Sequence, residues 1–122
     1  MKRLSCVFTT SANGTWNEGE PRANVKSVAL SMRFDSINAA EGTARVTDGF
    51  GYIEITAQRS ADALHFVQVF KTGPLYVTTV FDSASRDGKL KAVHSRHELT
   101  EAALPGFTSS PEQYYGECEV VP

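Results

Sequence analysis

The sequence predicts an all-β fold of eight short antiparallel strands in up-and-down order. We expect the strands to close into a barrel, with one short helix before the last strand. Three observations support this: apolar and polar residues alternate with a period of two, extended segments recur at near-regular intervals, and turn residues separate them. A barrel is favoured because closure removes the two unpaired edges of a sheet. A two-sheet β-sandwich is the alternative.

The clearest strand signal lies in residues 28–34, where Val28, Leu30, Met32 and Phe34 share one face. Asp-Gly pairs at residues 48–49 and 87–88 are typical of tight turns between strands. On this pattern the eight strands are expected at residues 4–10, 28–34, 42–48, 51–58, 63–70, 75–82, 88–96 and 114–121.

Two segments interrupt the alternation. Residues 13–26 are polar and rich in Gly, Asn and Pro, so we expect a loop or a short irregular strand there, with a turn at Asn13-Gly14. Glu98–Leu104 is the expected helix of one or two turns, because Pro105-Gly106 directly after it ends a helix.

Length and charge limit the classes of function. The chain of 122 residues is expected to form a single β-barrel domain over residues 1–122. Its net charge is −2, and Lys and Arg are scattered without a basic stripe, which disfavours nucleic-acid binding. No apolar run approaches the ~20 residues that a membrane-spanning helix needs. These features predict a soluble globular domain.

The N-terminal segment leaves the compartment open. Lys2 and Arg3 resemble the charged start of a signal peptide, but no apolar segment follows them. Either the protein is cytoplasmic as written, or it is periplasmic or secreted with its leader removed.

The two cysteines, Cys6 and Cys118, lie near opposite ends of the chain. Their spacing does not suit a redox pair or a zinc site, both of which use clustered cysteines. Two readings remain: two buried thiols, or a disulfide between the first and last strands, which become neighbours if the barrel closes. The disulfide would require an oxidising compartment.

The pair His94-x-x-His97 raises the question of a metal site. Residues 88–96 are expected to form a strand, and residues three apart on a strand point to opposite faces. His94 then shares a face with Arg96, and the two histidines cannot chelate one ion, so no metal ligand is predicted. Neither Ser95 nor Cys118 lies in a nucleophile motif around His94, so no catalytic residue, no cofactor and no enzymatic activity are predicted.

The segment Gly14-Thr15-Trp16 resembles the G-x-W motif of the lipocalins, and the strand count resembles the wider calycin group of lipocalin- and avidin-type barrels. The resemblance implies that Trp16 packs against an arginine from a late strand, here Arg96, and plugs one end of the barrel. The segments "AVHSRH" and "YYGECEV" resemble small bacterial proteins of unknown function.

Two functions are compatible with this fold. The first is a non-enzymatic binding protein that holds a small apolar or amphipathic ligand inside the barrel, with Trp16, His94, Arg96 and Tyr114 at one mouth fixing its polar end. The second is a solid barrel that acts through its outer surface or loops as a protein-protein interaction module or inhibitor. Composition cannot separate them, because residues that line a cavity and residues that fill a core are of the same types.

Overall fold

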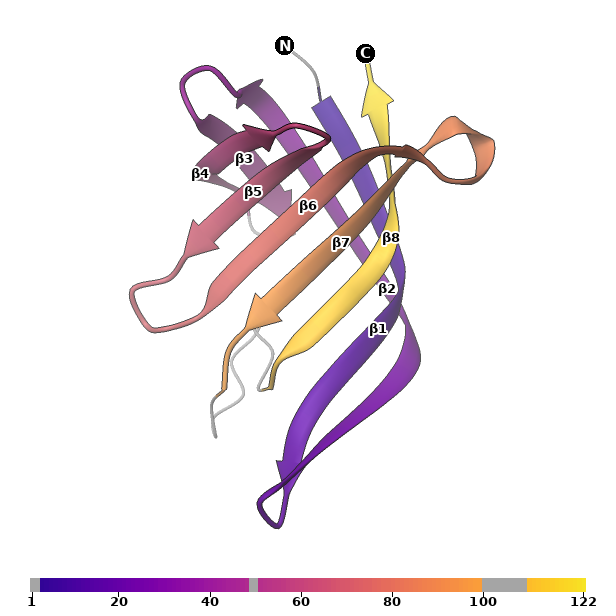
Figure 1. The fold of residues 1–122 in the computed structure, drawn as a ribbon. Coiled ribbons are helices and arrows are strands. Elements are labelled where there is room, and N and C mark those ends of the chain that lie inside the picture. The colour runs from indigo at the N-terminus through magenta and orange to yellow at the C-terminus, as the bar shows by residue number, and fades with distance from the viewer. Residues whose placement is uncertain (1–2, 49–50, 100–109) are drawn as a thin grey trace.

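The computed structural model describes residues 3–48, 51–99 and 110–122. Each strand pairs antiparallel with the next along the chain, and the last pairs with the first, so one sheet closes into a ring (Figure 1). The predicted all-β fold with eight antiparallel strands is confirmed, as one sheet rather than the two of a sandwich. The strands are β1 (Arg3–Asn17), β2 (Glu20–Asn38), β3 (Thr43–Asp48), β4 (Gly51–Ser60), β5 (Ala63–Val69), β6 (Leu75–Ala84), β7 (Leu90–His97) and β8 (Glu112–Val121).

The short helix predicted at Glu98–Leu104 is not shown. Glu98 and Leu99 are neither helix nor strand, and the rest of that segment lies outside the described residues, as does part of the turn predicted at residues 48–49. A three-residue 3₁₀ turn, η1 (Arg86–Gly88), connects β6 to β7 at the predicted Asp-Gly turn. Across the described ranges there is no helix with the length and hydrophobicity to cross a lipid bilayer.

The prediction of a loop or a short irregular strand at residues 13–26 is wrong, because the two long strands β1 and β2 continue through this segment and pair with each other up to Asn17 and Glu20. The turn is at Glu18-Gly19, where both residues have positive φ (52° and 83°), and not at Asn13-Gly14. Positive φ at both central residues is the conformation that suits a two-residue hairpin. The polar composition suggested a loop because strands usually bury one apolar face. Here the two strands hydrogen-bond to each other although neither face packs in the core.

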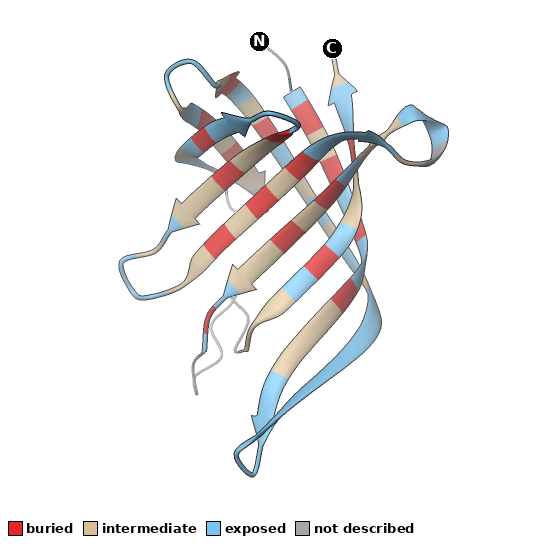
Figure 2. Cartoon of the chain, viewed as in Figure 1, coloured by how far each residue is buried: buried red, intermediate tan, exposed pale blue. Residues whose placement is uncertain are grey.

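The core consists of the inward-facing residues of successive strands. Buried residues alternate with half-buried ones along β6, and the buried residues of β7 and β8 lie two or four positions apart (Figure 2). Phe8, Phe34 and Phe66 are fully buried, and the rings of Phe34 and Phe66 stack with centroids 4.1 Å apart. This alternation is the physical reason that the period-two pattern identified the strands, since every second side chain leaves water.

The seam where β8 meets β1 is held by a disulfide. Cys6 on β1 is the direct partner of Cys118 on β8, and their sulfur atoms are bonded, with the Cα atoms 4.0 Å apart. Both cysteines are fully buried on the inner face. Two rungs away, Gly116 lies against a bulge of β1 between Phe8 and Thr10. A β-carbon on Gly116 would lie 2.0 Å from the carbonyl oxygen of Val7, so only glycine allows β1 to approach this closely.

Candidate functional site

A polar cluster centred on His94 lies inside the ring, on the inner face of β6, β7 and β8. His94 is only 1% exposed, and it sits between Thr78 on β6 and Tyr114 on β8. The Nε–H of Arg96 donates to His94 Nε2 at 3.0 Å. Because the arginine nitrogen can only donate, Nε2 is the acceptor, and the proton of a neutral imidazole lies on Nδ1. His94 Nδ1 therefore donates to Thr78 Oγ1, 2.7 Å away.

Arg96 lies on the neighbouring rung, between two tyrosines. Its guanidinium carbon is 4.6 Å from the ring centroid of Tyr76 and 5.3 Å from that of Tyr114. Such cation–π contacts favour a charged guanidinium at a half-buried site. The hydroxyl of Tyr76 donates to Glu98 Oε1 at 2.9 Å, and that of Tyr114 donates to Glu112. The two tyrosines beside Arg96 are thus each hydrogen-bonded to an acidic residue, Glu98 or Glu112.

Burial and charge shift the pKa values in this cluster. Desolvation, assisted by the positive charge of Arg96, lowers the pKa of His94 from 6.5 to about 3. Desolvation, together with its hydrogen bond to Glu112, raises the pKa of Tyr114. His94 is therefore neutral at physiological pH, and its accepting nitrogen is occupied by Arg96. An imidazole in this state cannot accept a proton from a substrate without first breaking the contact with Arg96.

Little space remains beside His94 among the described residues. The hollow bordered by Phe34, Phe66, Tyr76, Thr78 and His94 measures about 10 Å³. A space of this size holds at most about one water molecule. His94, Arg96 and Tyr114 thus form a polar layer inside the ring.

Three of the four residues predicted at the barrel mouth come together, and Trp16 does not. His94, Arg96 and Tyr114 form the cluster, whereas Trp16 is 53% exposed and pairs with Pro21 near the end of the β1–β2 hairpin. The expected packing of Trp16 on Arg96 is therefore corrected. Arg96 instead contacts two tyrosines, a role that the sequence could not assign because it depends on which strands flank β7.

The two histidines of the H-x-x-H pair face opposite ways. They lie on strand β7, where His94 is buried inside and His97 is exposed outside. Within the described part of the chain, no group of three or more His, Cys, Asp or Glu side chains is placed to hold a metal ion.

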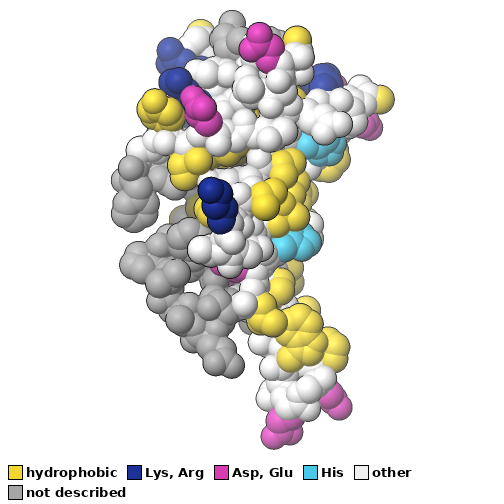
Figure 3. Space-filling model, turned by 90° about the vertical axis from the view of Figure 1, so that its left-hand side faces the viewer, with side chains coloured by type: hydrophobic (Ala, Val, Ile, Leu, Met, Phe, Trp, Pro, Cys, Tyr) yellow, Lys and Arg dark blue, Asp and Glu magenta, His cyan; other side chains and the backbone are white. Residues whose placement is uncertain are grey.

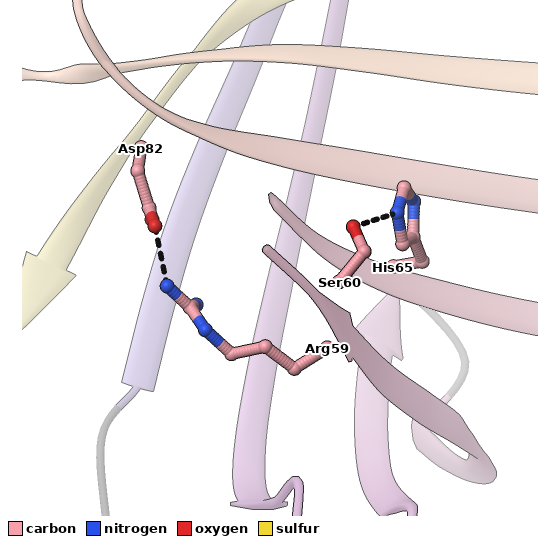
Figure 4. Close-up of polar contacts among 4 residues, drawn as sticks. All are labelled: Arg59, Ser60, His65 and Asp82. Carbon is pink, nitrogen blue, oxygen red and sulfur yellow. Dashed lines mark hydrogen bonds and ion pairs between the residues drawn. The ribbon is translucent and has the colours of Figure 1, made fainter. Parts of the chain in front are cut away.

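A second histidine network, which the sequence did not indicate, lies on the outer surface (Figure 4). Ser60 Oγ is 2.9 Å from His65 Nε2, and His65 Nδ1 is 2.8 Å from Thr79 Oγ1. Nearby, Arg59 and Asp82 form an ion pair between β4 and β6. The serine and histidine are arranged like a nucleophile and its base, but the third group is a hydroxyl. A carboxylate there would stabilise the imidazolium that forms during catalysis, and a threonine does not.

The most exposed apolar surface lies on the β1–β2 hairpin. The pairing of β1 with β8 reaches only to Asn13, and the pairing of β2 with β3 begins only at Arg33. Residues 12–25, called here the arm, therefore end in a two-stranded ribbon that projects beyond the other strands (Figure 1). An isolated two-stranded ribbon is marginally stable in water.

The arm has one apolar and one polar face, because directly opposite residues of a hairpin share a face and successive pairs alternate. Figure 3 shows hydrophobic side chains gathered along one side of the projecting arm, with acidic side chains at its tip. The apolar face carries the pairs Ala12–Val25, Gly14–Ala23 and Trp16–Pro21, and the other face carries Asn13–Asn24, Thr15–Arg22 and Asn17–Glu20. Val25 is 71% exposed. Together with Trp16 it forms an apolar patch in contact with water, which is energetically unfavourable.

Among the described residues, two hollows are large enough to bear on function. One of about 250 Å³ lies at the root of the arm, between Ala12, Gly14 and Ala23 on one side and Ser95, His97, Pro111 and Gln113 on the other. The second, of about 650 Å³, lies where β4 and β5 separate. Their pairing ends at Thr56–Val67, and beyond it Ile53, Ile55 and Val69 border an open groove.

Comparisons with known proteins found no matching family model, no matching curated protein and no matching solved structure.

Proposed function

We propose that this protein is a non-enzymatic protein-protein interaction module, a calycin-like barrel that binds partners through the apolar face of its β1–β2 arm. The observation that carries the proposal is the exposure of that face, where Trp16 and Val25 are half or more exposed on a ribbon that β8 accompanies only at its root. Large aromatic side chains exposed on a protein surface are the residues that most often contribute binding energy in protein interfaces.

The space beside His94 supports this reading over a ligand held at the level of His94. The hollow there measures about 10 Å³, against the ~300–1,000 Å³ of small-molecule sites. The polar groups at this level are engaged with one another, from Thr78 through His94 to Arg96. In this proposal the cluster has a structural role and holds β6, β7 and β8 together.

The disulfide supports a compartment as part of the proposal. A disulfide between Cys6 and Cys118 persists in an oxidising environment and is rare in the cytosol. We therefore propose that the protein acts outside the cytoplasm, in the periplasm or after secretion.

The groove between β4 and β5 keeps ligand binding as a second candidate. Its volume of about 650 Å³ is within the range of small-molecule sites, and its border mixes Ile53 and Ile55 with Thr43, Arg45 and Glu54. An amphipathic ligand would find both apolar and charged contacts there.

Native mass spectrometry of the protein from its own host tests both candidates. We expect the wild-type chain to be retained in a complex with a protein partner, and the variants Trp16→Ser and Val25→Ser to be released from it. Asn24→Ser is the matched control, because Asn24 is next to Val25 in sequence but lies on the polar face of the arm. A small-molecule adduct on a chain without protein partners would contradict the proposal and favour the groove.

A further inference from the structure

We propose that the gap between β4 and β5 binds an extended peptide segment of a partner protein, which enters the sheet as an added strand. The gap is the groove of about 650 Å³ that opens where the two strands separate, and it shares no residue with the arm. It is therefore a second interaction surface, which goes beyond the proposed function and does not depend on it. Strand addition of this kind joins two proteins through backbone hydrogen bonds.

An edge of β4 without a partner strand faces the gap. The N–H of Ala57 donates to the carbonyl of Gly42, beside β3, at 3.0 Å. Backbone groups of successive residues on a strand point to opposite neighbours, so those of Thr56, Glu54 and Tyr52 point to the β5 side. The pairing of β4 with β5 ends at Thr56. Within the described chain, no strand therefore lies opposite the backbone N–H and C=O groups of Glu54 and Tyr52.

The edge of β5 across the gap also lacks a partner strand. The N–H of Phe70 donates to the carbonyl of Pro74, on the β6 side, at 2.9 Å. By the same alternation, the backbone groups of Val69 point to β4, from which β5 has separated. A strand that enters here has a neighbour on each side, so it comes from a segment that is not already part of a sheet. An exposed loop or a chain end of a partner meets this condition, whereas the sheet edge of a second folded barrel does not.

The β4 edge is regular enough to pair with an added strand. Residues 51–55 contain no proline, and their pairing with β3 continues without a bulge. Proline, bulges and inward-pointing charges are among the usual means by which proteins protect an exposed edge. The side chains that point inward here are apolar, Ile53 and Ile55, on the same face as buried Ala57. The edge therefore lacks these three forms of protection.

The side chains beside the gap define the sequence of the occupant. Directly opposite residues of neighbouring strands share a face, so every second residue of the added strand lies beside Ile53 or Ile55, where apolar side chains are favoured. The residues between them lie beside Tyr52 and Glu54 on the outer face. The Glu54 side chain is 76% exposed, with Arg45 on its β3 side at 3.6 Å, and its β5 side is open to a Lys or Arg. The occupant is thus an extended segment with apolar residues at alternate positions and a basic residue between them.

Fluorescence polarisation with the fluorescein-labelled peptide Val-Lys-Val-Thr-Val tests the inference on the purified, disulfide-bonded chain. In antiparallel register with β4, its Lys lies opposite Glu54 and its Thr opposite Tyr52. We expect saturable binding with a Kd below about 1 mM. The same peptide N-methylated at Lys and Thr keeps the side chains but loses two backbone donors to β4, and it should bind at least about fivefold more weakly. Absence of binding overturns the inference, as does equal binding of both peptides, which would indicate a pocket for side chains or small molecules.

Charge reversal locates the peptide on the molecule. Glu54→Lys should weaken binding about threefold and should favour Val-Glu-Val-Thr-Val instead. Glu41→Lys is the matched control, because Glu41 is exposed and lies outside the groove. Trp16→Ser should bind the peptide like the wild type. Loss of binding in Trp16→Ser would place the peptide on the arm and overturn the inference, as would an affinity that does not respond to Glu54→Lys.

Proline substitution tests the direction of the backbone groups separately. Glu54→Pro removes an N–H that faces the gap, so the variant should stay folded while its affinity for the peptide falls at least about fivefold. Ile53→Pro removes an N–H on the β3 side, where Ile53 pairs with Val46, and should lower the melting temperature much more. Each variant is compared with the alanine variant at the same position, which accounts for the lost side chain. An equal loss of melting temperature for the two prolines would overturn the orientation of β4 on which the inference rests.

Discussion

Cys6 and Cys118 are direct neighbours across the seam between the first and last strands, although 112 residues separate them in sequence. The bond lies on the inner face, where neither cysteine is exposed. It converts the hydrogen-bonded closure of the ring into a covalent one. The first and last strands are therefore joined covalently as well as by hydrogen bonds.

Replacing both cysteines by alanine should lower the free energy of unfolding by about 3–5 kcal/mol, because an unfolded chain cross-linked over so long a loop loses much of its entropy. Urea unfolding followed by circular dichroism measures the change. Wild-type protein unfolded with a reductant should lose a similar amount, while Cys6→Ala/Cys118→Ala should not respond to the reductant. Equal stability of the oxidised and reduced wild-type protein would contradict a structural role for the bond.

Gly116→Ala should destabilise the protein by several kcal/mol or prevent folding, because the added methyl group overlaps the backbone of Val7 and Phe8. Gly14→Ala is the matched control in the neighbouring strand, since a β-carbon there has its nearest neighbour at 3.9 Å. Thermal unfolding of the two variants at low concentration compares them. Similar melting temperatures for both would show that β1 can move away from β8 at no cost.

The neutral state of His94 should make the stability pH-dependent. Its folded pKa of about 3 lies below the unfolded value of 6.5, so the protein must be most stable above pH 6.5 as far as this group is concerned. Below that pH the unfolded chain binds a proton that the folded one rejects, which costs up to about 1.4 kcal/mol per pH unit down to pH 3.

The variant His94→Gln isolates this effect from the carboxylates that titrate in the same range. We expect the wild-type free energy of unfolding to fall more steeply than that of His94→Gln between pH 6.5 and pH 4, as measured by urea unfolding at each pH. Parallel curves for the two proteins would mean that His94 is protonated as easily in the barrel as in the unfolded chain.

The surface network of Ser60, His65 and Thr79 should be chemically inert. A serine-directed fluorophosphonate is expected to leave no adduct on Ser60, because the third group of the network is the hydroxyl of Thr79, where a catalytic triad has a carboxylate. Intact-mass spectrometry after prolonged incubation detects any adduct. An adduct that disappears in Ser60→Ala and His65→Gln would identify a nucleophile and would count against a non-enzymatic role.

The fold was predictable where one face of a strand is buried. Residues 28–34 alternate because one face packs in the core, and the strand prediction there is confirmed. Residues 13–26 were predicted to be a loop or a short irregular strand because neither face of the arm packs in the core. Their sequence is therefore mostly polar, and the alternation of a core strand is hard to see in it. The alternation is nevertheless present across the hairpin, where apolar Trp16 faces Pro21 and polar Thr15 faces Arg22. It becomes visible only when the turn is known to lie at Glu18-Gly19.

The candidate site was predictable only in part. That His94 and Arg96 share a face followed from their spacing on one strand, and their hydrogen bond agrees with it. That Tyr76 and Tyr114 flank Arg96 depends on the register of β6 and β8 against β7, which no local pattern encodes. Ser60, His65 and Thr79 likewise come from three strands, and nothing in their separate neighbourhoods connects them.

By itself, the sequence determined the strands of the core and the side of each strand that leaves water, because hydrophobic alternation is a local property with a period of two residues. Only the tertiary structure decided which strands became neighbours across the ring. That choice filled the space beside His94, placed Cys6 against Cys118, and left the apolar face of the arm exposed. These features depend on long-range register and on where pairing stops, which are set by the packing of the whole sheet and not by any one segment.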